Sequence, residues 1–425
     1  MCDKNKQVLL FVDTIVNANI GSKRYITKNV YDAAIERINR VFDDFDNLYL
    51  SFSAGKDSTV LLHLFLKIAK ERGFGKVPVL LIDLEAQYKA TMEHAVEIMA
   101  RDDVDPIWVC LPLNLRNAVS QYQPQWICWD PEEKDKWVRQ YPEVPGVITD
   151  TNYFPFFKFA MEFEEFVIEF GNWFADGEKT ACIVAIRSDE SFNRYRTIKN
   201  KRKETFENLA WSTKVTDNVY NFYPIYDWRT EDVWTAIGKN NWCYNKIYDL
   251  MYLQGKSIHE CRICQPYGDD QRAGLDLFRS CEPETWAKVV DRVSGANFGN
   301  IYCKSYLLGH RSVVLPEGHT WKSYTEFLLA TIPQYEAEWY IEKFKVFEKW
   351  WEKHGYPVDK WSDAKLKKGD IRLVGPDGRV YTKGPSWERL AKCILKNDKL
   401  CKSLSFSQTK NQFRKYITMR EMYGY

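Results

Sequence analysis

One stretch of the chain combines residue types that suit an anionic ligand, and it reads Ser53-Ala54-Gly55-Lys56-Asp57-Ser58. It joins an apolar run at residues 47–52 to a helical pattern at residues 59–66, so a small-residue turn would open a helix there. The first N–H groups of a helix lack internal partners and attract anions. Lys56 adds a positive charge, and Asp57 would suit Mg²⁺ that arrives with a phosphate. These residues predict a phosphate site, with an ordinary serine-capped turn as the alternative.

Two later segments also place polar side chains where a predicted element begins or ends. Arg187, Asp189 and Arg194 follow the apolar run at residues 180–186, at a strand end where substrate groups are commonly met. A solvated loop with internal Arg–Asp pairs is the alternative interpretation. Residues 223–234 read Tyr-Pro-Ile-Tyr-Asp-Trp-Arg-Thr-Glu-Asp-Val-Trp and open a helix, for which Thr230 is the expected cap.

The three segments, in this order, resemble the motifs of one family. The first is similar to the PP-loop of the N-type ATP pyrophosphatases, usually Ser-Gly-Gly-Lys-Asp-Ser, with Ala54 in place of the first glycine. The second and third resemble the Gly-Ile-Arg-x-Asp-Glu-Ser-x-x-Arg and Pro-x-x-Asp-Trp-x-x-x-Asp-Val-Trp segments of phosphoadenosine phosphosulfate reductases. Over roughly residues 45–280 the chain is identified as a member of the phosphoadenosine phosphosulfate reductase-like family, in the subgroup typified by the immunoglobulin-binding regulator IbrA.

The resemblance implies a nucleotide site and a reaction. Its substrate would be ATP or an adenosine-phosphosulfate with Mg²⁺, and ATP would be cleaved at the α–β bond to give adenylyl transfer and pyrophosphate. Lys56, Asp57, Ser58 and Arg187 would act on the phosphates. The remaining expected nucleotide contacts are Ser53, Ala54, Gly55, Asp83, Asp189 and Arg194. Asp83 stands where the family has Asp-Thr-Gly after the second strand, although Leu84 and Glu85 follow it here.

The cysteines depart from the reductase pattern. The family's C-terminal Glu-Cys-Gly-Leu-His is absent, and Cys393 and Cys401 do not restore its context, so we do not expect sulfite release. One Cys-x-x-Cys remains, Cys261 to Cys264. Four ligands make a structural zinc site, so a zinc ion here would need two more, for which the candidates are His259, Cys281, Cys303 and His310. A redox pair and plain core thiols are the alternatives.

Periodicity predicts an α/β fold with a parallel sheet, helices on both faces and a mostly helical C-terminal region. The resemblance implies that this Rossmann-like sheet is of the adenine nucleotide α-hydrolase type. Helices are expected at residues 29–42 and 91–100, and strands at residues 77–83, 107–110 and 180–186. We expect four parts, namely a helical lead-in (1–45), the nucleotide-binding domain (46–280, with an insertion around 121–157), a connecting region (281–331) and a basic region (332–425).

Charge is unevenly distributed along the 425 residues. Residues 332–425 hold 20 Lys and Arg against 12 Asp and Glu, whereas the whole chain has a net charge of only +2. Nucleic acid is therefore a candidate partner of the basic region, and the competing interpretation is a solvated basic surface. The 11 Cys and the lack of a long apolar run favour a cytoplasmic protein without a membrane partner. An enzyme, a regulatory nucleotide-binding module acting through a protein partner, and a nucleic-acid modification enzyme remain open.

Overall fold

A computed structural model describes most of the chain. The described residues are 19–20, 23–24, 27–120, 123, 125–200, 202–268, 274–293, 295–296, 315–364, 373–374, 380–381, 384–395, 398, 401–404, 418–419 and 422. The chain divides into two compact units, residues 1–296 and 297–425. Among the residues described, none of the helices combines the length and the apolar character that crossing a membrane requires.

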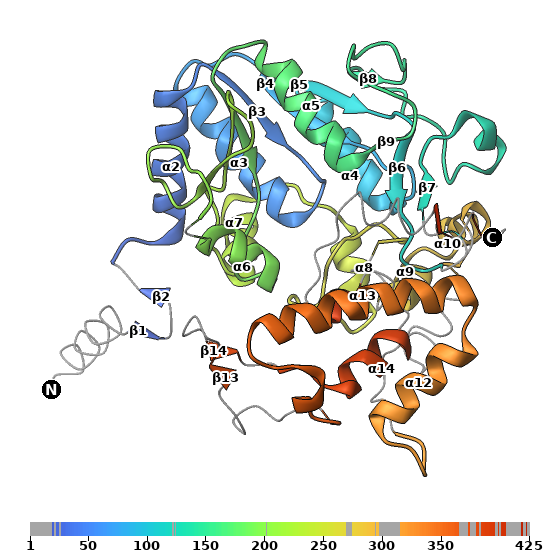
Figure 1. The fold of residues 1–425 in the computed structure, drawn as a ribbon. Helices are drawn as coiled ribbons and strands as arrows, with labels where there is room; N and C mark the ends of the chain where they lie inside the picture. The colour runs from blue at the N-terminus through green and yellow to red at the C-terminus, as the bar shows by residue number, and fades with distance from the viewer. Residues whose placement is uncertain are drawn as a thin grey trace, which may run out of the picture. The chain divides into compact units, whose positions relative to one another are not determined.

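A seven-stranded sheet forms the centre of the first unit (Figure 1). From one edge to the other its strands are β11 (Ser212–Lys214), β12 (Val219–Phe222), β10 (Thr180–Val184), β3 (Asn47–Ser51), β4 (Val77–Ile82), β5 (Val104–Val109) and β8 (Val147–Ile148). All neighbours pair in parallel except β11, which is antiparallel to β12. The predicted parallel α/β sheet is confirmed, because its central strands are continuous apolar runs that can be buried on both faces.

Helices connect the strands and flank the sheet (Figure 1). They are α2 (Val30–Asp44), α3 (Lys56–Glu71), α4 (Lys89–Met99), α5 (Phe163–Ala175), α6 (Phe192–Lys199), α7 (Thr230–Asn240), α8 (Ile247–Leu253), α9 (Leu275–Cys281) and α10 (Pro283–Arg292). Helix α2 buries Ala33, Ala34, Ile38 and Val41, the face that its helical spacing predicts. The neighbouring central strands β10, β3 and β4 are parallel, so their C-terminal ends lie side by side at one end of the sheet. This arrangement brings the first two polar segments together.

The start of α7 corrects one prediction. Thr230 was expected to cap this helix, but the N-cap is Arg229 and Thr230 is the first helical residue. The carboxylate of Asp232 accepts a hydrogen bond from the backbone N–H of Arg229 at 2.7 Å. An acid at the third helical position therefore satisfies the helix end in place of a threonine hydroxyl.

The segment expected as an insertion, residues 121–157, contributes strands to two sheets. Strand β8 extends the central sheet beside β5, and β7 (Gln125–Ile127) joins a three-stranded sheet with β6 (Leu113–Arg116) and β9 (Met161–Glu162). A short 3₁₀ helix, η1 (Pro131–Lys136), lies between β7 and β8. A hairpin of β1 (Asn19–Ile20) and β2 (Lys23–Arg24) precedes α2. The four-part division of the chain remains a prediction.

The second unit is mostly helical and has a hydrophobic core of its own. Its elements are α12 (Trp321–Thr331), α13 (Gln334–Lys353), η4 (Val358–Lys360), β13 (Leu373–Val374), β14 (Val380–Tyr381), α14 (Trp387–Leu395) and η5 (Lys402–Leu404). Its core joins aromatic side chains of α13, among them Phe347 and Trp351, to Leu390 and Ile394 of α14. A helical C-terminal region was predicted and is confirmed.

Candidate functional site

The Ser53–Ser58 loop connects β3 to the first turn of α3. Gly55 is the N-cap of α3, with φ −84° and ψ 165°, and Ala54 adopts the left-handed conformation, with φ 54°. The Oγ atoms of Ser53 and Ser58 lie 3.1 Å apart, and the Ser58 hydroxyl also donates to the carbonyl of Gly55 at 3.0 Å. Ser53 is exposed, so the open side of this tight turn faces solvent at the positive end of the helix.

Asp57 and Arg187 form an ion pair that joins the first two motifs. The Nε of Arg187 donates to Oδ1 of Asp57 at 2.8 Å, and Nη2 lies 3.3 Å from Oδ2. Only 1% of Arg187 is exposed, and its Nη1 points to the carbonyl of Trp228 in the third motif at 3.4 Å. Around this one arginine the structure therefore gathers residues of all three motifs, from Asp57 to Trp228.

Lys56 is buried beneath the same loop. Its ammonium donates to the carbonyl of Cys261 at 3.1 Å and lies 5.2 Å from the ring centroid of Tyr248. Burial lowers the pKa of Lys56 below its usual value, and the charge of Asp57 partly opposes that effect. A nearby phosphate would stabilise the charged form of this lysine and so replace the solvation that burial removes.

Two residues that the sequence analysis missed hold the loop from the other side. The backbone N–H of Lys56 donates to the hydroxyl of Tyr248 at 3.0 Å, and Nδ2 of Asn245 donates to the carbonyl of Ala54 at 3.0 Å. Asn245 is fully buried and also donates to the hydroxyl of Thr91. Asn245 lies just before α8 and Tyr248 in its first turn, about 190 residues from the loop. No local motif marks either residue, so the sequence carried no signal for them.

Asp83 lies inside the protein, where protein groups surround its carboxylate. It accepts hydrogen bonds from the indole N–H of Trp108 at 2.9 Å and the backbone N–H of Glu85 at 3.0 Å, and it pairs with Arg139. None of its side-chain surface is exposed. The observed contacts organise the segment after β4, and a nucleotide contact by Asp83 remains a prediction.

The other predicted contacts lie beyond the end of β10. Asp189 is exposed, and Arg194 forms an ion pair with Glu190 at 3.0 Å. Glu190 also faces Arg262, with Nη2 3.5 Å from Oε1. Arg194 follows Arg187 by seven residues, whereas Arg262 comes from the Cys-x-x-Cys segment. Both are engaged by Glu190, so an anion entering here would compete with that carboxylate.

The Cys-x-x-Cys segment borders the loop through its backbone. Cys261 is buried and Cys264 is partly buried. Among the described residues, a group of His, Cys and acidic side chains close enough to share a metal ion occurs at His94, Glu97 and Cys243, and it includes neither cysteine of the Cys-x-x-Cys segment. Cys303 and His310 lie outside the described residues. Zinc at Cys261 and Cys264 therefore remains a prediction.

The two described cysteines of the second unit, Cys393 and Cys401, are buried. Neither Cys393 nor Cys401 has measurable exposure, and the pKa of Cys393 is raised well above its usual value by the hydrogen bond with Cys401 and by burial. A thiol in this state is a poor nucleophile because little thiolate forms.

Two family models match adjoining parts of the chain. The phosphoadenosine phosphosulfate reductase domain matches residues 47–255, and the domain of unknown function DUF3440 matches residues 255–384 and 379–415. The chain is 37% identical over 391 residues to the protein YbdN of Escherichia coli (strain K12). The aligned region covers 90% of this chain and 92% of YbdN.

The solved structures to which the chain is similar are more distant. The Candida glabrata FMN adenylyltransferase is 16% identical with a TM-score of 0.32, covering 57% of this chain and 66% of that one, just under two thirds. A phosphoadenylyl-sulfate reductase from Candida auris is 13% identical with a TM-score of 0.26, covering 59% of this chain and 93% of that one. Likenesses at these scores do not bear on activity.

Proposed function

The chain belongs to the phosphoadenosine phosphosulfate reductase-like family of PP-loop nucleotide-binding proteins, and we propose that it binds ATP at the Ser53–Ser58 loop and transfers the adenylyl group with release of pyrophosphate. The observation that carries the proposal is the ion pair between Asp57 and Arg187 at the N-terminus of α3. It brings charged groups of the first two motifs together, beside the Trp228 carbonyl of the third, at the end of the sheet where α/β proteins bind ligands.

The loop geometry suits a polyphosphate. Backbone N–H groups at the start of α3, the ammonium of Lys56 and the guanidinium of Arg187 supply positive potential around Gly55. In adenylyl transfer, negative charge develops on the leaving pyrophosphate, and fixed cations in a buried site stabilise that charge more strongly than water does. Lys56 and Arg187 would stabilise the leaving group, while Ser53 and Ser58 would donate to phosphate oxygens.

Magnesium fits the donor set of the loop. Asp57 is the carboxylate of the Ser53–Ser58 stretch, and a Mg²⁺ ion held mainly by phosphate oxygens needs one or two protein carboxylates. When bound, the ion would supply charge neutralisation on the polyphosphate. Since Asp57 is paired with Arg187 here, binding of the ion would require the carboxylate to share or release that arginine.

Sulfite release by a cysteine nucleophile is not part of this proposal. The reductase C-terminal motif is absent from the sequence, and the described cysteines of the second unit, Cys393 and Cys401, are buried thiols. An adenosine-phosphosulfate remains an alternative substrate of the same site, because it presents the same adenylyl group and an anionic leaving group.

The decisive experiment follows the fate of the α-phosphate. ATP labelled at the α-phosphate is incubated with the protein and Mg²⁺, with and without sulfate, nucleic acid or cell extract. We expect AMP or an AMP adduct together with pyrophosphate, and loss of the reaction in Lys56→Gln and Asp57→Asn. Lys70→Gln, an exposed change in the last turn of the same helix, is the matched control. ADP with inorganic phosphate as products would refute the proposed bond cleavage.

The same experiment separates the enzyme from a regulatory module. Tight ATP binding that Lys56→Gln abolishes, with no product under any of these conditions, would favour a nucleotide-binding regulator that acts through a protein partner. A product that appears only when nucleic acid is added would favour nucleic-acid modification. Neither outcome would alter the assignment of the loop as the nucleotide site.

A further inference from the structure

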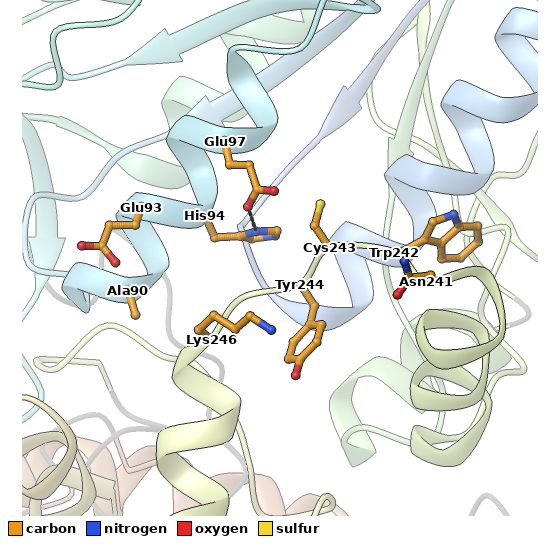
Figure 2. A pocket seen from close by; sticks show the side chains of 9 residues that line it. All are labelled: Ala90, Glu93, His94, Glu97, Asn241, Trp242, Cys243, Tyr244 and Lys246. Atoms are coloured by element: carbon orange, nitrogen blue, oxygen red, sulfur yellow. Dashed lines mark ion pairs between the residues drawn. The ribbon is translucent and has the colours of Figure 1, made fainter.

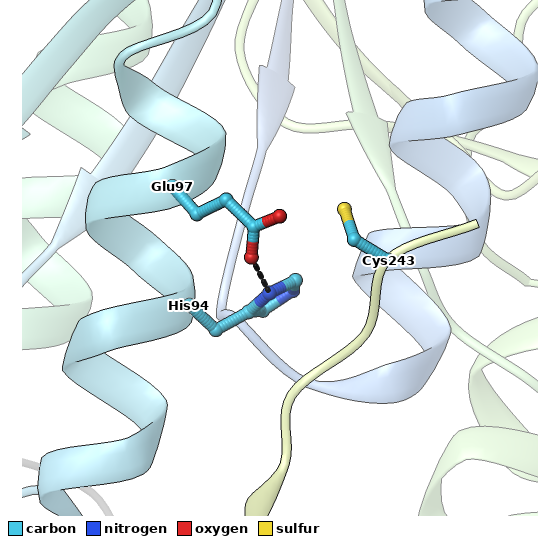
Figure 3. Close-up of side chains that lie close together, drawn as sticks. All are labelled: His94, Glu97 and Cys243. Carbon is cyan, nitrogen blue, oxygen red and sulfur yellow. Dashed lines mark ion pairs between the residues drawn. The ribbon is translucent and has the colours of Figure 1, made fainter.

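A second cluster of reactive side chains lies away from the PP-loop. His94 and Glu97 stand three residues apart on one face of α4, and Cys243 projects toward them from the segment between α7 and α8 (Figure 3). Their ligand atoms all lie within 4.8 Å of one another. Imidazole, thiolate and carboxylate together form a donor set that suits zinc and poorly suits magnesium or calcium.

The imidazole of His94 is buried, and within the described part of the chain one of its ring nitrogens has a hydrogen-bond partner while the other lacks one. Only 4% of His94 is exposed, and among the residues that the structure describes its Nδ1 has no hydrogen-bond partner. The other ring nitrogen, Nε2, lies 2.9 Å from the hydroxyl oxygen of Thr59. If Nε2 carries the proton and donates it to Thr59, Nδ1 presents its lone pair to the cluster, which is the arrangement found for metal-bound histidines.

The distance between the histidine and the glutamate suits tetrahedral coordination. With metal–ligand bonds of about 2.0–2.3 Å, neighbouring ligand atoms are roughly 3.3–3.8 Å apart. Nδ1 of His94 and Oε2 of Glu97 are 3.7 Å apart, and the side chain of Glu97 is 60% exposed and can adjust. Nε2 of His63 lies 3.4 Å from the carbonyl oxygen of Cys243 and 3.5 Å from its Sγ, so this ring packs directly against the third ligand. The ring of His63 is in turn stacked on Trp242 at 5.1 Å.

A pocket of about 400 Å³ opens onto these side chains (Figure 2). Its lining includes His94, Glu97 and Cys243, together with polar neighbours such as Glu93 and Lys246. None of its lining residues belongs to the Ser53–Ser58 loop or to the segment around Arg187. An ion bound by three protein ligands here would keep a fourth position open to the pocket and to water.

We propose that His94, Glu97 and Cys243 form a zinc site with one open coordination position. Binding exchanges the thiol proton of Cys243 for the metal and releases that proton to solvent. Thr59, which contacts His94, donates its backbone N–H to the carbonyl of Gly55 at 2.9 Å, so the site adjoins the helix that begins at the PP-loop. The site itself does not depend on the proposed nucleotide chemistry.

Cobalt substitution tests the proposal with a thiolate-specific signal. The untagged full-length protein, stripped of metal, is titrated with Co²⁺, and the near-ultraviolet thiolate-to-cobalt charge-transfer band is followed. We expect the band to saturate at one ion per chain, to be reversed by Zn²⁺, and to be lost in Cys243→Ser. Cys264→Ser, which removes a cysteine of the competing Cys-x-x-Cys segment, is the matched control and should keep the band.

A second variant protects the test against misfolding. Glu97→Gln changes a largely exposed side chain, so the fold should be kept while the Zn²⁺ dissociation constant rises about tenfold or more. Glu93→Gln, on the same helix and in the same pocket but outside the cluster, should leave zinc affinity unchanged. No stoichiometric binding, or a band that survives Cys243→Ser and disappears in Cys264→Ser, would overturn the proposal.

Discussion

At the scale of single residues, Gly55 is a position where a substitution should affect ligand binding more than folding. A Cβ built on Gly55 would lie 3.5 Å from Oγ of Ser53 and 3.5 Å from the hydroxyl of Tyr248, which is ordinary van der Waals contact. Its φ of −84° is open to any residue. The fold therefore tolerates alanine here, whereas a phosphate approaching the N–H groups of α3 would meet the added methyl group.

We predict that Gly55→Ala changes the free energy of unfolding by less than about 1 kcal/mol. ATP affinity should fall about tenfold or more, because a lost hydrogen bond to a charged group is worth about 1.5–3 kcal/mol. Urea unfolding and calorimetric titration with ATP measure the two effects. Gly238→Ala, in α7 with open space around its added Cβ, is the control and should bind ATP normally. Unchanged ATP affinity in Gly55→Ala would speak against the loop as the phosphate site.

The buried ammonium of Lys56 gives a prediction about pH. Its folded-state pKa lies below the 10.5 of an ordinary lysine, chiefly because of burial. In the window between these two values the unfolded chain binds the proton and the folded chain does not, so this group makes stability rise with pH there. We expect Lys56→Gln to remove that rise in the pH range below 10.5, as followed by urea unfolding. Lys70→Gln should retain it, and an unchanged slope in Lys56→Gln would contradict the burial effect.

At the scale of elements, two buried acids tie the segment after β7 to the end of β4. Glu85 accepts hydrogen bonds from the backbone N–H groups of Trp129, at 2.7 Å, and Val138, at 3.1 Å. Its carboxylate also forms an ion pair with Arg292 of α10 at 2.7 Å, and neither side chain of that pair is more than 1% exposed. Together with the Asp83–Arg139 pair, these contacts anchor residues 129–139 against the C-terminal end of the sheet.

We predict that Glu85→Ala lowers the free energy of unfolding by about 3–5 kcal/mol, because it leaves the guanidinium of Arg292 buried with a reduced set of partners. Hydrogen exchange of residues 125–141 should accelerate selectively. Glu93→Ala, which removes an exposed carboxylate paired with Lys89, should cost less than about 1 kcal/mol. Equal losses in the two variants would mean that the Glu85 network is not a stabilising anchor.

At the scale of the whole molecule, each compact unit has its own hydrophobic core. The core of the first unit runs from Ala34 to Ala296 and that of the second from Trp321 to Leu404. The PP-loop and the proposed zinc site both lie in the first unit. Separate cores can unfold in separate cooperative steps.

We predict two thermal transitions that respond to different changes. ATP with Mg²⁺ should raise the midpoint of one transition only, by linkage worth about 2.7 kcal/mol at a hundredfold excess over its dissociation constant. Phe347→Ala should lower the midpoint of the other transition, because Phe347 is buried in the second core and its loss reduces the free energy of unfolding of that unit by about 3–5 kcal/mol. Calorimetry of the full-length chain measures both, and a single transition that both changes shift would contradict the independence of the cores.

The sequence by itself determined the features that local pattern specifies. Apolar runs such as residues 77–83 predicted the buried parallel strands, helical spacing predicted the buried face of α2, and three motifs predicted the family. These succeed because strand burial, helix amphipathicity and a loop at a helix start each depend on a few neighbouring residues. The predicted Thr230 cap was wrong by one position, because an acceptor at the third helical position can also bond the helix end, and the Asp232 carboxylate does so here.

Only the tertiary structure decided which distant residues meet. Tyr248 and Asn245 support the PP-loop from about 190 residues away, and Arg187 meets Asp57 because their strands, β10 and β3, are neighbours. His94 and Glu97 of α4 lie close to Cys243 of the segment between α7 and α8. No local pattern records such encounters, since they depend on the order of parallel strands and on how the helices pack. The same packing places Asp83 among Trp108 and Arg139, and burial at that position is a property of the assembled sheet.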